Sequence, residues 1–404
     1  MDIAMSAMPT TAVGAAADPD RIAVRVVRDI AAVAPLWDRL AAVGVGSPFQ
    51  ARGFVEPWFR HLAASERARP LIVVGETARG EAFVLPLALG RAGPVRVAGF
   101  PGGSHANTNV GLFDPGLWQR LTADDVAAVW TGLAAEADVD LVALRAQPAR
   151  FAGRDNPFAA GWVRPAPHMA YAVDLAGGFE AVLSRHKGGK KRGKVRSRRK
   201  ALADVGGFTV RRAEDCAEAS AILETFFAQK AARFEQQGIP DVFSCPKTRD
   251  FFRDVLAATG PDGTPSTQLW TLEIAGGRRA TAIAVAFAGT VYLVMNSFAL
   301  DEYARTSPGE VLLYHVIEDC CARGEQVFDF GVGDARYKRS WADHEVALVD
   351  TMVPLTAPGT AAALAFDARR RLRDYVVARP ALLKLARRVL RRRTEGEEAG
   401  GGED

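Results

Sequence analysis

The order of the predicted elements repeats once along the chain, and this repetition constrains the fold more than any other feature of the sequence. Each copy has three short strands of alternating apolar and polar residues with glycine-bearing turns between them, then a loop, a helix and one more strand. The second copy begins about 200 residues after the first. The segments are 71–76, 82–89, 95–100, 123–137 and 140–145 in the first copy, and 268–274, 281–287, 291–298, 308–323 and 327–330 in the second. This order predicts an α/β (α+β) fold of two tandem duplicated domains, each with a mixed, largely antiparallel sheet flanked by helices.

Proline, glycine and charge clusters divide the chain further. The stretch 153–167 is rich in glycine and proline and predicts the boundary between the two copies. The N-terminal stretch is rich in alanine, with the acidic Asp2 and no early basic cluster, so it predicts a disordered leader rather than a secretory signal. After Pro358 the chain becomes alanine-rich and then basic, which predicts amphipathic helices interrupted at Pro380. The expected parts are a disordered leader at 1–20, a first domain at 21–165, a second domain at 166–356, basic amphipathic helices at 357–394 and a disordered tail at 395–404.

The composition is that of a soluble globular protein, since 49% of the 404 residues are hydrophobic and 24% are charged. The formal net charge is only +4, so global charge does not predict a nucleic-acid-binding protein. No apolar run approaches the roughly 18 residues of a membrane span. The cysteines form neither a C-x-x-C pair nor a Cys/His grouping at zinc-ligand spacing, which predicts buried free thiols in a reducing cytoplasm and no metal site. The cysteines are Cys216, Cys245, Cys320 and Cys321.

A helix between residues 305 and 324 carries the sharpest local signal. Ser307, Pro308 and Glu310 match a capping box with proline at the first helical position, and Gly324 follows the last periodic residue. Arg305 and the free N–H groups of the first turn are suited to a pyrophosphate. A capping box, however, would already satisfy those groups and would place the Glu310 carboxylate near the same space. The helix is predicted in both interpretations, which differ in whether its first turn binds a ligand.

A short strand and a polar loop follow this helix. The order Arg-x-x-Pro-Gly-Glu, helix, strand, then Gly-x-Gly-Asp-x-x-Tyr-Lys and Trp341 resembles the GNAT acyltransferases. It is most similar to the branch that includes the acetyltransferases encoded beside cellulose-synthesis genes and the Fem-type peptidyl transferases. The resemblance covers roughly 170–350 well, and the tandem arrangement covers 21–350 loosely. The usual GNAT pyrophosphate loop is Gln/Arg-x-x-Gly-x-Gly/Ala, which Arg305 fits and the Pro-Gly-Glu that follows does not.

The resemblance implies transfer of an acetyl group from acetyl-CoA to an amine or hydroxyl, with the chemistry in the second copy and acceptor binding in the first. Such a reaction needs a deprotonated nucleophile, a stabilised oxyanion and a proton for the departing thiolate. Fem-type enzymes are similar in using a lysine of the Tyr-Lys motif, so Lys338 is assigned charge stabilisation, Asp334 the role of base and Tyr337 that of acid. A surface or packing role is the alternative for each. His344 is a further candidate.

The acetyl donor, acetyl-CoA, is predicted to bind at the start of the helix between residues 305 and 324. The acceptor is predicted to bind at a basic segment and at a loop of the first copy. The basic segment 187–200 lacks interleaved aromatic residues, so it does not predict a single-strand RNA platform. Contact with a nucleotide-linked or lipid-linked substrate, contact with transfer RNA and a solvated surface helix stay open as its uses. The predicted donor-binding residues are Arg305, Thr306, Ser307, Gly309, Asn296 and Ser297. The predicted acceptor-binding residues are Lys190, Lys191, Arg192, Arg196, His105 and Asn107.

The C-terminal basic residues, 369–371 and 387–393, alternate with leucine, valine and tyrosine. Packing on the core is one explanation for such helices, and peripheral contact with an anionic membrane surface is the other. The sequence as a whole predicts a cytoplasmic acetyltransferase that acts on a small or carbohydrate-type acceptor related to polysaccharides or the cell envelope. One alternative is a Fem-type, aminoacyl-tRNA-dependent peptidyl transferase, the one case in which nucleic acid is an expected partner. The other is a non-catalytic scaffold in exopolysaccharide biosynthesis.

Overall fold

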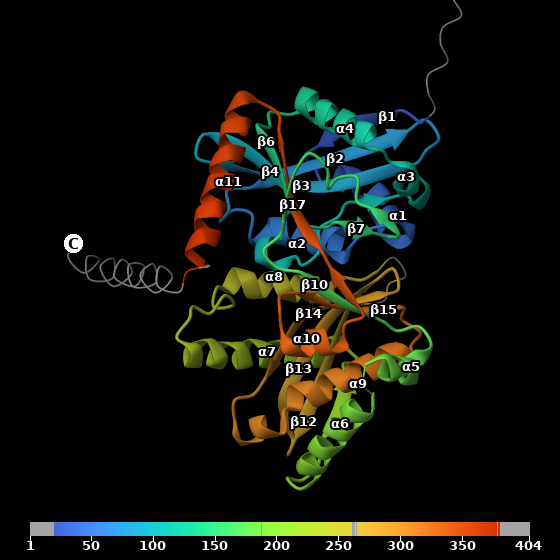
Figure 1. The fold of residues 1–404 in the computed structure, drawn as a ribbon, viewed down its shortest axis with the longest axis vertical. Helices are drawn as coiled ribbons and strands as arrows, with labels where there is room; N and C mark the ends of the chain where they lie inside the picture. Colours follow the sequence, from blue (N-terminus) through green and yellow to red (C-terminus); the bar gives the residue numbers. More distant parts are fainter. Residues whose placement is uncertain (1–19, 187, 261–262, 264, 378, 380–404) are drawn as a thin grey trace, which may run out of the picture.

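The computed structural model describes residues 20–186, 188–260, 263, 265–377 and 379, so the predicted leader (except Asp20), the tail and all of 380–394 lie outside the described residues. Two sheets lie one above the other along the long axis of the molecule, each covered by helices (Figure 1). The duplicated order of three antiparallel strands, loop, helix and strand is present in both halves. The predicted fold class is therefore confirmed.

The first sheet has the strand order β1-β2-β3-β4-β6-β17-β9, with β5 beside β3, and β4–β6 is its parallel pair. Its strands are β1 (Ile22–Val27), β2 (Arg69–Thr77), β3 (Ala82–Ala92), β4 (Val95–Gly99), β5 (Leu112–Phe113), β6 (Leu141–Pro148), β9 (Trp162–Pro165) and β17 (Leu348–Pro354), and a separate hairpin is formed by β7 (Arg150–Phe151) and β8 (Arg154–Asp155). The helices of this half are η1 (Ala31–Val33), α1 (Ala34–Val43), η2 (Pro48–Gln50), α2 (Arg52–His61), η3 (Gly103–His105), α3 (Pro115–Arg120), α4 (Ala123–Glu136) and α11 (Ala357–Val377).

The second sheet has the order β11-β12-β13-β14-β15-β10-β16, and β14–β15 is its parallel pair. Its strands are β10 (Ala170–Asp174), β11 (Thr209–Arg212), β12 (Thr267–Ile274), β13 (Gly277–Phe287), β14 (Thr290–Phe298), β15 (Val327–Val332) and β16 (His344–Val346). The helices are α5 (Gly178–Arg185), α6 (Gly188–Ala203), α7 (Cys216–Gln237), α8 (Pro246–Ala257), η4 (Glu302–Thr306), α9 (Pro308–Ala322) and α10 (Arg336–Trp341). The basic segment of the sequence is therefore the helix α6.

The two halves share a hydrophobic core. One cluster of buried residues joins α1 and α2 of the first half to α7 and α8 of the second, with both sheets contributing to it. The ring of Phe54 stands edge-on to Phe251 at 5.2 Å between centroids, and Phe49 lies 6.1 Å from Tyr292 in the same way. Because burial of such aromatic rings dominates the energetics of an interface, the halves are held together as one packed body.

The strand β17 belongs to the first sheet although it comes late in the chain. It runs from the second half into the first (Figure 1), where it pairs with β6 on one side and β9 on the other. The predicted second domain, 166–356, thus includes a strand that completes the first sheet. Alternation within a strand shows which face is buried and does not show which sheet supplies the partner.

The cysteines also differ from expectation. Cys320 is buried and Cys321 is half-buried on α9, whereas Cys216 and Cys245 are exposed where α7 and α8 begin. The prediction of buried thiols is wrong for the latter pair, because positions at the start of a helix lie outside its buried stripe. No helix in the described part of the chain is long and apolar enough to cross a membrane.

Candidate functional site

The parallel strands β14 and β15 stop pairing part-way along their length. Their pairing begins at Thr290 with Val327 and ends at Tyr292 with Asp329. Two residues further on, β14 has a bulge at Val294, where its register with β13 shifts. A bulge bends a strand and increases its twist, so β14 bends just after its last pair with β15. We call the unpaired stretch beyond Tyr292 and Asp329 the β14–β15 gap; a Cβ on Gly331 of β15 would lie 3.2 Å from the Leu293 carbonyl oxygen, so the strands are still close at that point.

A tight turn at Gly331 closes one side of this gap. Gly331 has a φ of +71°, and a Cβ there would lie 2.8 Å from the Asn107 amide nitrogen. The Asp329 carboxylate accepts a hydrogen bond from the Gly331 N–H at 2.6 Å, and the Lys338 ammonium donates one to the Gly331 carbonyl at 3.2 Å. Lys338 also donates to the carbonyl of Val332 at 2.7 Å. The turn is thus held by residues of β15, α10 and the first-half loop.

Lys338 and Asp329 are buried ionisable groups, each 8% exposed. Burial lowers the pKa of Lys338 to about 8, and the charge of Asp329 opposes that shift. Burial raises the pKa of Asp329 to about 6, and the raised pKa of Tyr292 follows from burial and from the nearby Asp329 carboxylate. Lys338 lies on the short helix α10, not in a loop as predicted. Perturbed, buried charges beside a gap in a sheet are typical of functional sites.

Tyr337 of α10 contacts Asn296 of β14. The Asn296 side-chain amide donates to the Tyr337 hydroxyl at 3.4 Å, and burial raises the pKa of that hydroxyl. Ser297, in contrast, is buried and donates to Gln229 of α7 at 2.6 Å, so its hydroxyl is used in packing. The structure therefore brings Asn296 to the gap and turns Ser297 away from it.

Asp334 and His344 are exposed. The Asp334 carboxylate accepts a hydrogen bond from Arg339 at 2.6 Å, and both side chains are more than half exposed. His344 lies on the edge strand β16, opposite Ala172 of β10, which itself faces Asp329 of β15. His344 is thus two strands away from the Lys338 cluster.

The start of α9 differs from the predicted capping box. Ser307 is in the left-handed region, with φ 55° and ψ 57°, and its side chain makes no capping hydrogen bond. Glu310 turns instead to α6, where Lys194 lies 2.7 Å from its carboxylate and Arg198 also contacts it. The capping-box prediction is wrong because Ser307 is in the left-handed region and not in the extended conformation from which a capping side chain reaches the first turn. Pro308 at the first helical position is confirmed.

Several cations surround this helix start. Arg305 is exposed on η4, which packs against α6, and Thr306 is buried with its hydroxyl donated to the Tyr303 carbonyl. The pKa of Lys194 is lowered by partial burial and by the neighbouring charges of Arg198 and Arg336. Sequence reasoning missed Lys194 and Arg198; their i, i+4 spacing, which places both on one face of α6, was the available signal.

The predicted acceptor residues on α6 divide into two groups. Lys191 donates to the Ser340 carbonyl at 2.6 Å and lies 4.0 Å from the centre of the Trp341 ring, and burial lowers its pKa to about 8. Arg192 bonds Glu180 of α5 at 2.6 Å. These contacts attach α6 to α5 and α10, whereas Lys190 and Arg196 are exposed.

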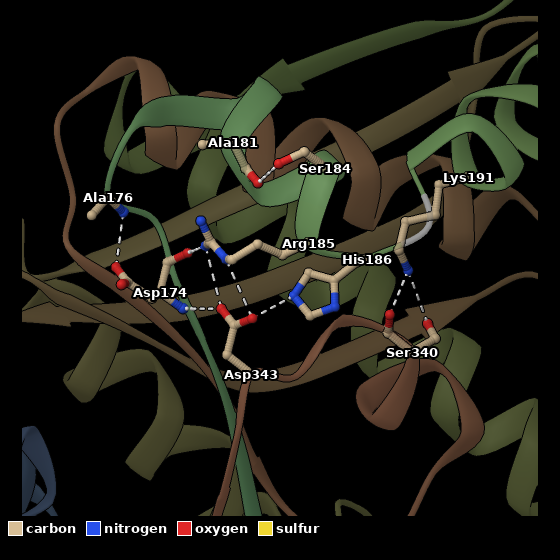
Figure 2. A network of polar contacts seen from close by, with 9 residues as sticks. All are labelled: Asp174, Ala176, Ala181, Ser184, Arg185, His186, Lys191, Ser340 and Asp343. Atoms are coloured by element: carbon tan, nitrogen blue, oxygen red, sulfur yellow. Dashed lines mark hydrogen bonds and ion pairs between the residues drawn. The ribbon is translucent and has the colours of Figure 1, made fainter.

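Asp343 anchors the turn that leads into α6. Its carboxylate accepts hydrogen bonds from the Asp174 backbone at 3.0 Å and from Arg185, and it lies 2.8 Å from the His186 ring (Figure 2). The figure shows these groups converging from β10, from the end of α5 and from the segment that follows α10. This network fixes the basic helix next to the Lys338 cluster.

The first-half loop contributes one residue to the gap. Asn107 meets Gly331, as described above. His105 instead packs its ring against Phe251 and Phe252, with centroids 5.9 and 5.2 Å away, and burial lowers its pKa. Asn107 is thus at the site and His105 belongs to the shared core.

The region that contains the β14–β15 gap is similar to a known protein family. Residues 189–339 match the family model described as an acetyltransferase (GNAT) domain. This part of the chain is similar to GNAT-type acetyltransferase domains. The matched region includes α6, the β14–β15 gap, the start of α9 and Lys338. No curated protein gives a significant match to the whole chain.

Solved structures resemble the chain over most of its length. The structure of FemX superposes with a TM-score of 0.56 at 12% identity, covering 79% of this chain and 96% of that one. The C-terminal domain (DUF2156) of a lysylphosphatidylglycerol synthetase from Agrobacterium fabrum gives 0.46 at 15% identity, with 77% and 94% covered. A tandem GNAT protein from the clavulanic acid biosynthesis pathway gives 0.42 at 12% identity, with 82% and 98% covered. At such identities FemX shows a shared fold and no shared substrate.

Proposed function

We propose that the protein transfers an acetyl group from acetyl-CoA to an amine or hydroxyl of an acceptor related to polysaccharides or the cell envelope. The observation that carries this proposal is the gap after the Tyr292–Asp329 pair, with the buried Lys338 cation beside it and a GNAT-type domain around it. A gap between two strands lets a ligand hydrogen-bond to exposed backbone groups and reach both faces of the sheet.

The start of α9 supplies the chemistry that a diphosphate needs. Arg305 is exposed there, and Lys194 and Arg198 come from α6. Among the described residues, no acceptor takes the Gly309 N–H, so one helix-terminal donor remains for a ligand. Glu310 holds the two α6 cations and competes with a phosphate for them. These residues fit the diphosphate of acetyl-CoA, with Asn296 nearer the gap.

Lys338 is proposed to stabilise negative charge. Acetyl-CoA, when bound, supplies the thioester that the acceptor attacks. The Lys338 ammonium carries three donors and uses two on the carbonyls of Gly331 and Val332, which leaves one for an oxyanion. Asp329 keeps the ammonium charged against burial. Tyr337 stays the proposed acid, and Asp334 stays the proposed base on condition that its contact with Arg339 opens.

The acceptor is proposed to bind where the two halves meet. Asn107 brings the first half to Gly331. The exposed cations Lys190 and Arg196 of α6 favour an acceptor that carries phosphate or carboxylate groups. A lipid-linked or nucleotide-linked sugar has this chemistry.

A Fem-type aminoacyl-tRNA-dependent transfer is the second candidate. It is supported by the fold shared with FemX and by the exposed cations of α6, which suit a phosphate backbone. The scaffold alternative is less well supported, because a buried charge such as Lys338 is expensive to keep where it serves no function.

Calorimetry on the full chain separates these functions. We expect acetyl-CoA to bind, and Arg305→Ala to weaken binding about tenfold, the equivalent of one charge-assisted hydrogen bond. The matched control is Arg212→Ala, an exposed arginine on β11. Absence of binding at millimolar acetyl-CoA removes the acetyltransferase proposal. Tight transfer RNA binding that weakens steeply with salt would favour the second candidate in its place.

A further inference from the structure

The outward face of α11 is apolar. Leu364, Leu372 and Tyr375 are 57%, 64% and 52% exposed, although large apolar side chains are ordinarily covered. Leu372 and Tyr375 follow Leu364 by eight and eleven residues. At about 100° per residue, the three side chains therefore lie within an arc of roughly 80° around the helix. The small exposed residues Ala361 and Ala368 lie within the same arc. These five residues are named the α11 stripe.

The opposite face of α11 is fixed to the first sheet. Ala363 is fully buried, Asp367 lies 2.9 Å from Arg164 of β9, and Arg370 lies 3.1 Å from Asp350 of β17. At the start of the helix, a Cβ on Gly359 would lie 1.7 Å from the Asp140 carbonyl oxygen, so the backbones touch there. The helix therefore cannot rotate to bury the stripe, which stays on the outside of the molecule (Figure 1).

Positive charge borders the α11 stripe. Arg369 and Arg371 are exposed on the same helix, about 60° and 20° beyond the two edges of the stripe at 100° per residue, and Arg371 also lies 2.9 Å from Asp367. Arg373 lies on another face of the helix and pairs with Asp374, the one exposed acid of the stretch 368–376. The sequence that follows, 380–393, adds six cations and no acid, namely Lys384, Arg387, Arg388, Arg391, Arg392 and Arg393. An apolar strip with an aromatic residue and bordering arginines has the pattern of a helix that lies in a lipid–water interface.

We propose that α11 docks the protein on an anionic lipid surface, with the α11 stripe facing the acyl chains and the bordering arginines facing the headgroups. A second copy of the chain is the less suitable occupant, because two such helices would bring like charges together around the stripe. Anionic headgroups instead complement each arginine, with roughly 1 kcal/mol per basic residue near the surface. This docking is independent of the chemistry proposed for Lys338.

Vesicle flotation of the full chain tests the docking. The probes are vesicles of phosphatidylcholine alone and vesicles in which one third is phosphatidylglycerol. We expect binding to the anionic vesicles, weaker binding at high salt, and at least a tenfold loss of bound protein for the triple variant Leu364→Ser, Leu372→Ser, Tyr375→Ser. The control is Val242→Ser, an apolar residue of the α7–α8 connection with 57% exposure, which should bind like the unsubstituted chain.

Each other result overturns the proposal. Equal binding to neutral vesicles removes the role of charge, and undiminished binding of the triple variant assigns the contact to residues after 379. A dimer in light scattering that the triple variant abolishes assigns the stripe to a second copy. Because the substituted side chains are exposed, thermal unfolding and acetyl-CoA calorimetry should be unchanged. Failure of docking is thus distinguishable from failure of the proposed acetyl transfer.

Discussion

The helices α4 and α9 have equivalent places in the two halves and begin in opposite ways. In α4, Thr122 accepts a hydrogen bond from the Asp125 N–H at 3.2 Å, and the Asp125 carboxylate accepts one from the Thr122 N–H at 2.8 Å. In α9, Ser307 makes no such bond, and cations gather around the first turn. The first half satisfies its helix terminus with its own side chains, whereas the second leaves the Gly309 N–H, which we propose takes a ligand.

The two parallel strand pairs differ in the groups beside them, not in how closely the strands approach. Beyond the last β4–β6 pair, a Cβ on Gly99 would lie 2.7 Å from the Ala143 carbonyl oxygen, and beyond the last β14–β15 pair a Cβ on Gly331 would lie 3.2 Å from the Leu293 carbonyl oxygen. The β14–β15 pair ends on an ionisable residue, Asp329, with the Lys338 ammonium nearby. The comparison supports our proposal that one copy of the fold acts as framework while the other carries the chemistry.

Removal of the Lys338 charge should have the largest effect. We expect Lys338→Ala to lower kcat about 10²- to 10³-fold, the range for loss of one oxyanion donor, and Lys338→Arg to retain part of the rate. The control is Lys247→Ala, an exposed lysine on α8. The measurement is acetyl-CoA turnover with thiol detection, together with a thermal melt to show that the variant is folded. A Lys338→Ala enzyme with unchanged kcat would remove the catalytic assignment.

Substitution of alanine for Gly99, beside the β4–β6 pair, and for Gly331, beside the β14–β15 pair, allows a direct comparison of the two strand pairs. Both Gly331→Ala and Gly99→Ala should destabilise the fold by roughly 1–3 kcal/mol, because each added Cβ meets a neighbouring group and Gly331 also has a positive φ. Only Gly331→Ala should also lower kcat, by about tenfold, since it displaces the carbonyl that holds Lys338. Denaturant unfolding and kcat on the folded fraction separate the effects. Equal kcat values would show that the Gly331 turn does not position Lys338.

The pH dependence follows from the charge of Lys338. Since the ammonium is the active form and its pKa is about 8, kcat should fall as the pH rises through that value. Asp329→Asn removes the charge that raises this pKa, so the midpoint should move to lower pH and the rate at pH 8 should drop roughly two- to fivefold. Tyr292 and Tyr337, which also lie near, have raised pKa values and stay neutral in this range. An Asp329→Asn profile that moves to higher pH would contradict the account.

Neutralising one carboxylate in each helix start gives the smallest effects and the sharpest contrast. Glu310→Gln should strengthen acetyl-CoA binding roughly threefold, because Lys194 and Arg198 are freed for phosphate. Asp125→Asn should leave that affinity unchanged and destabilise the fold by roughly 0.5–1 kcal/mol through loss of the capping box. Calorimetry and thermal unfolding of both variants test this. Weaker binding by Glu310→Gln would place the donor elsewhere.

Much of the fold could be predicted because local patterns determine it. The duplicated strands and helices follow from alternation, periodicity and turn residues, and the Pro308 and Gly324 ends of α9 from their fixed backbone preferences. The assignment of β17 to the first sheet could not be predicted, since pairing across 200 or more residues leaves no local trace.

The site was predictable only in part. The motif was enough to predict Lys338, Tyr337 and Arg305 as candidates. Asp329 could not be predicted, because in the sequence it is a single acid within an apolar strand, and its place at the site depends on the pairing of β15 with β14 at Tyr292. The capping box was placed on α9 because the residue types match. It failed there because Ser307 is left-handed, and it formed on α4, where Thr122 has the extended conformation of a capping residue.

Amide hydrogen exchange with and without acetyl-CoA tests most directly the claim that one copy binds the donor. The account predicts slower exchange in 293–311 and 331–338 on addition of acetyl-CoA, because β14, the start of α9 and the Gly331 turn would contact it. Exchange in the equivalent first-half segments, 98–126, should not change. Protection confined to the first half, or no protection in either half at saturating acetyl-CoA, would contradict the account.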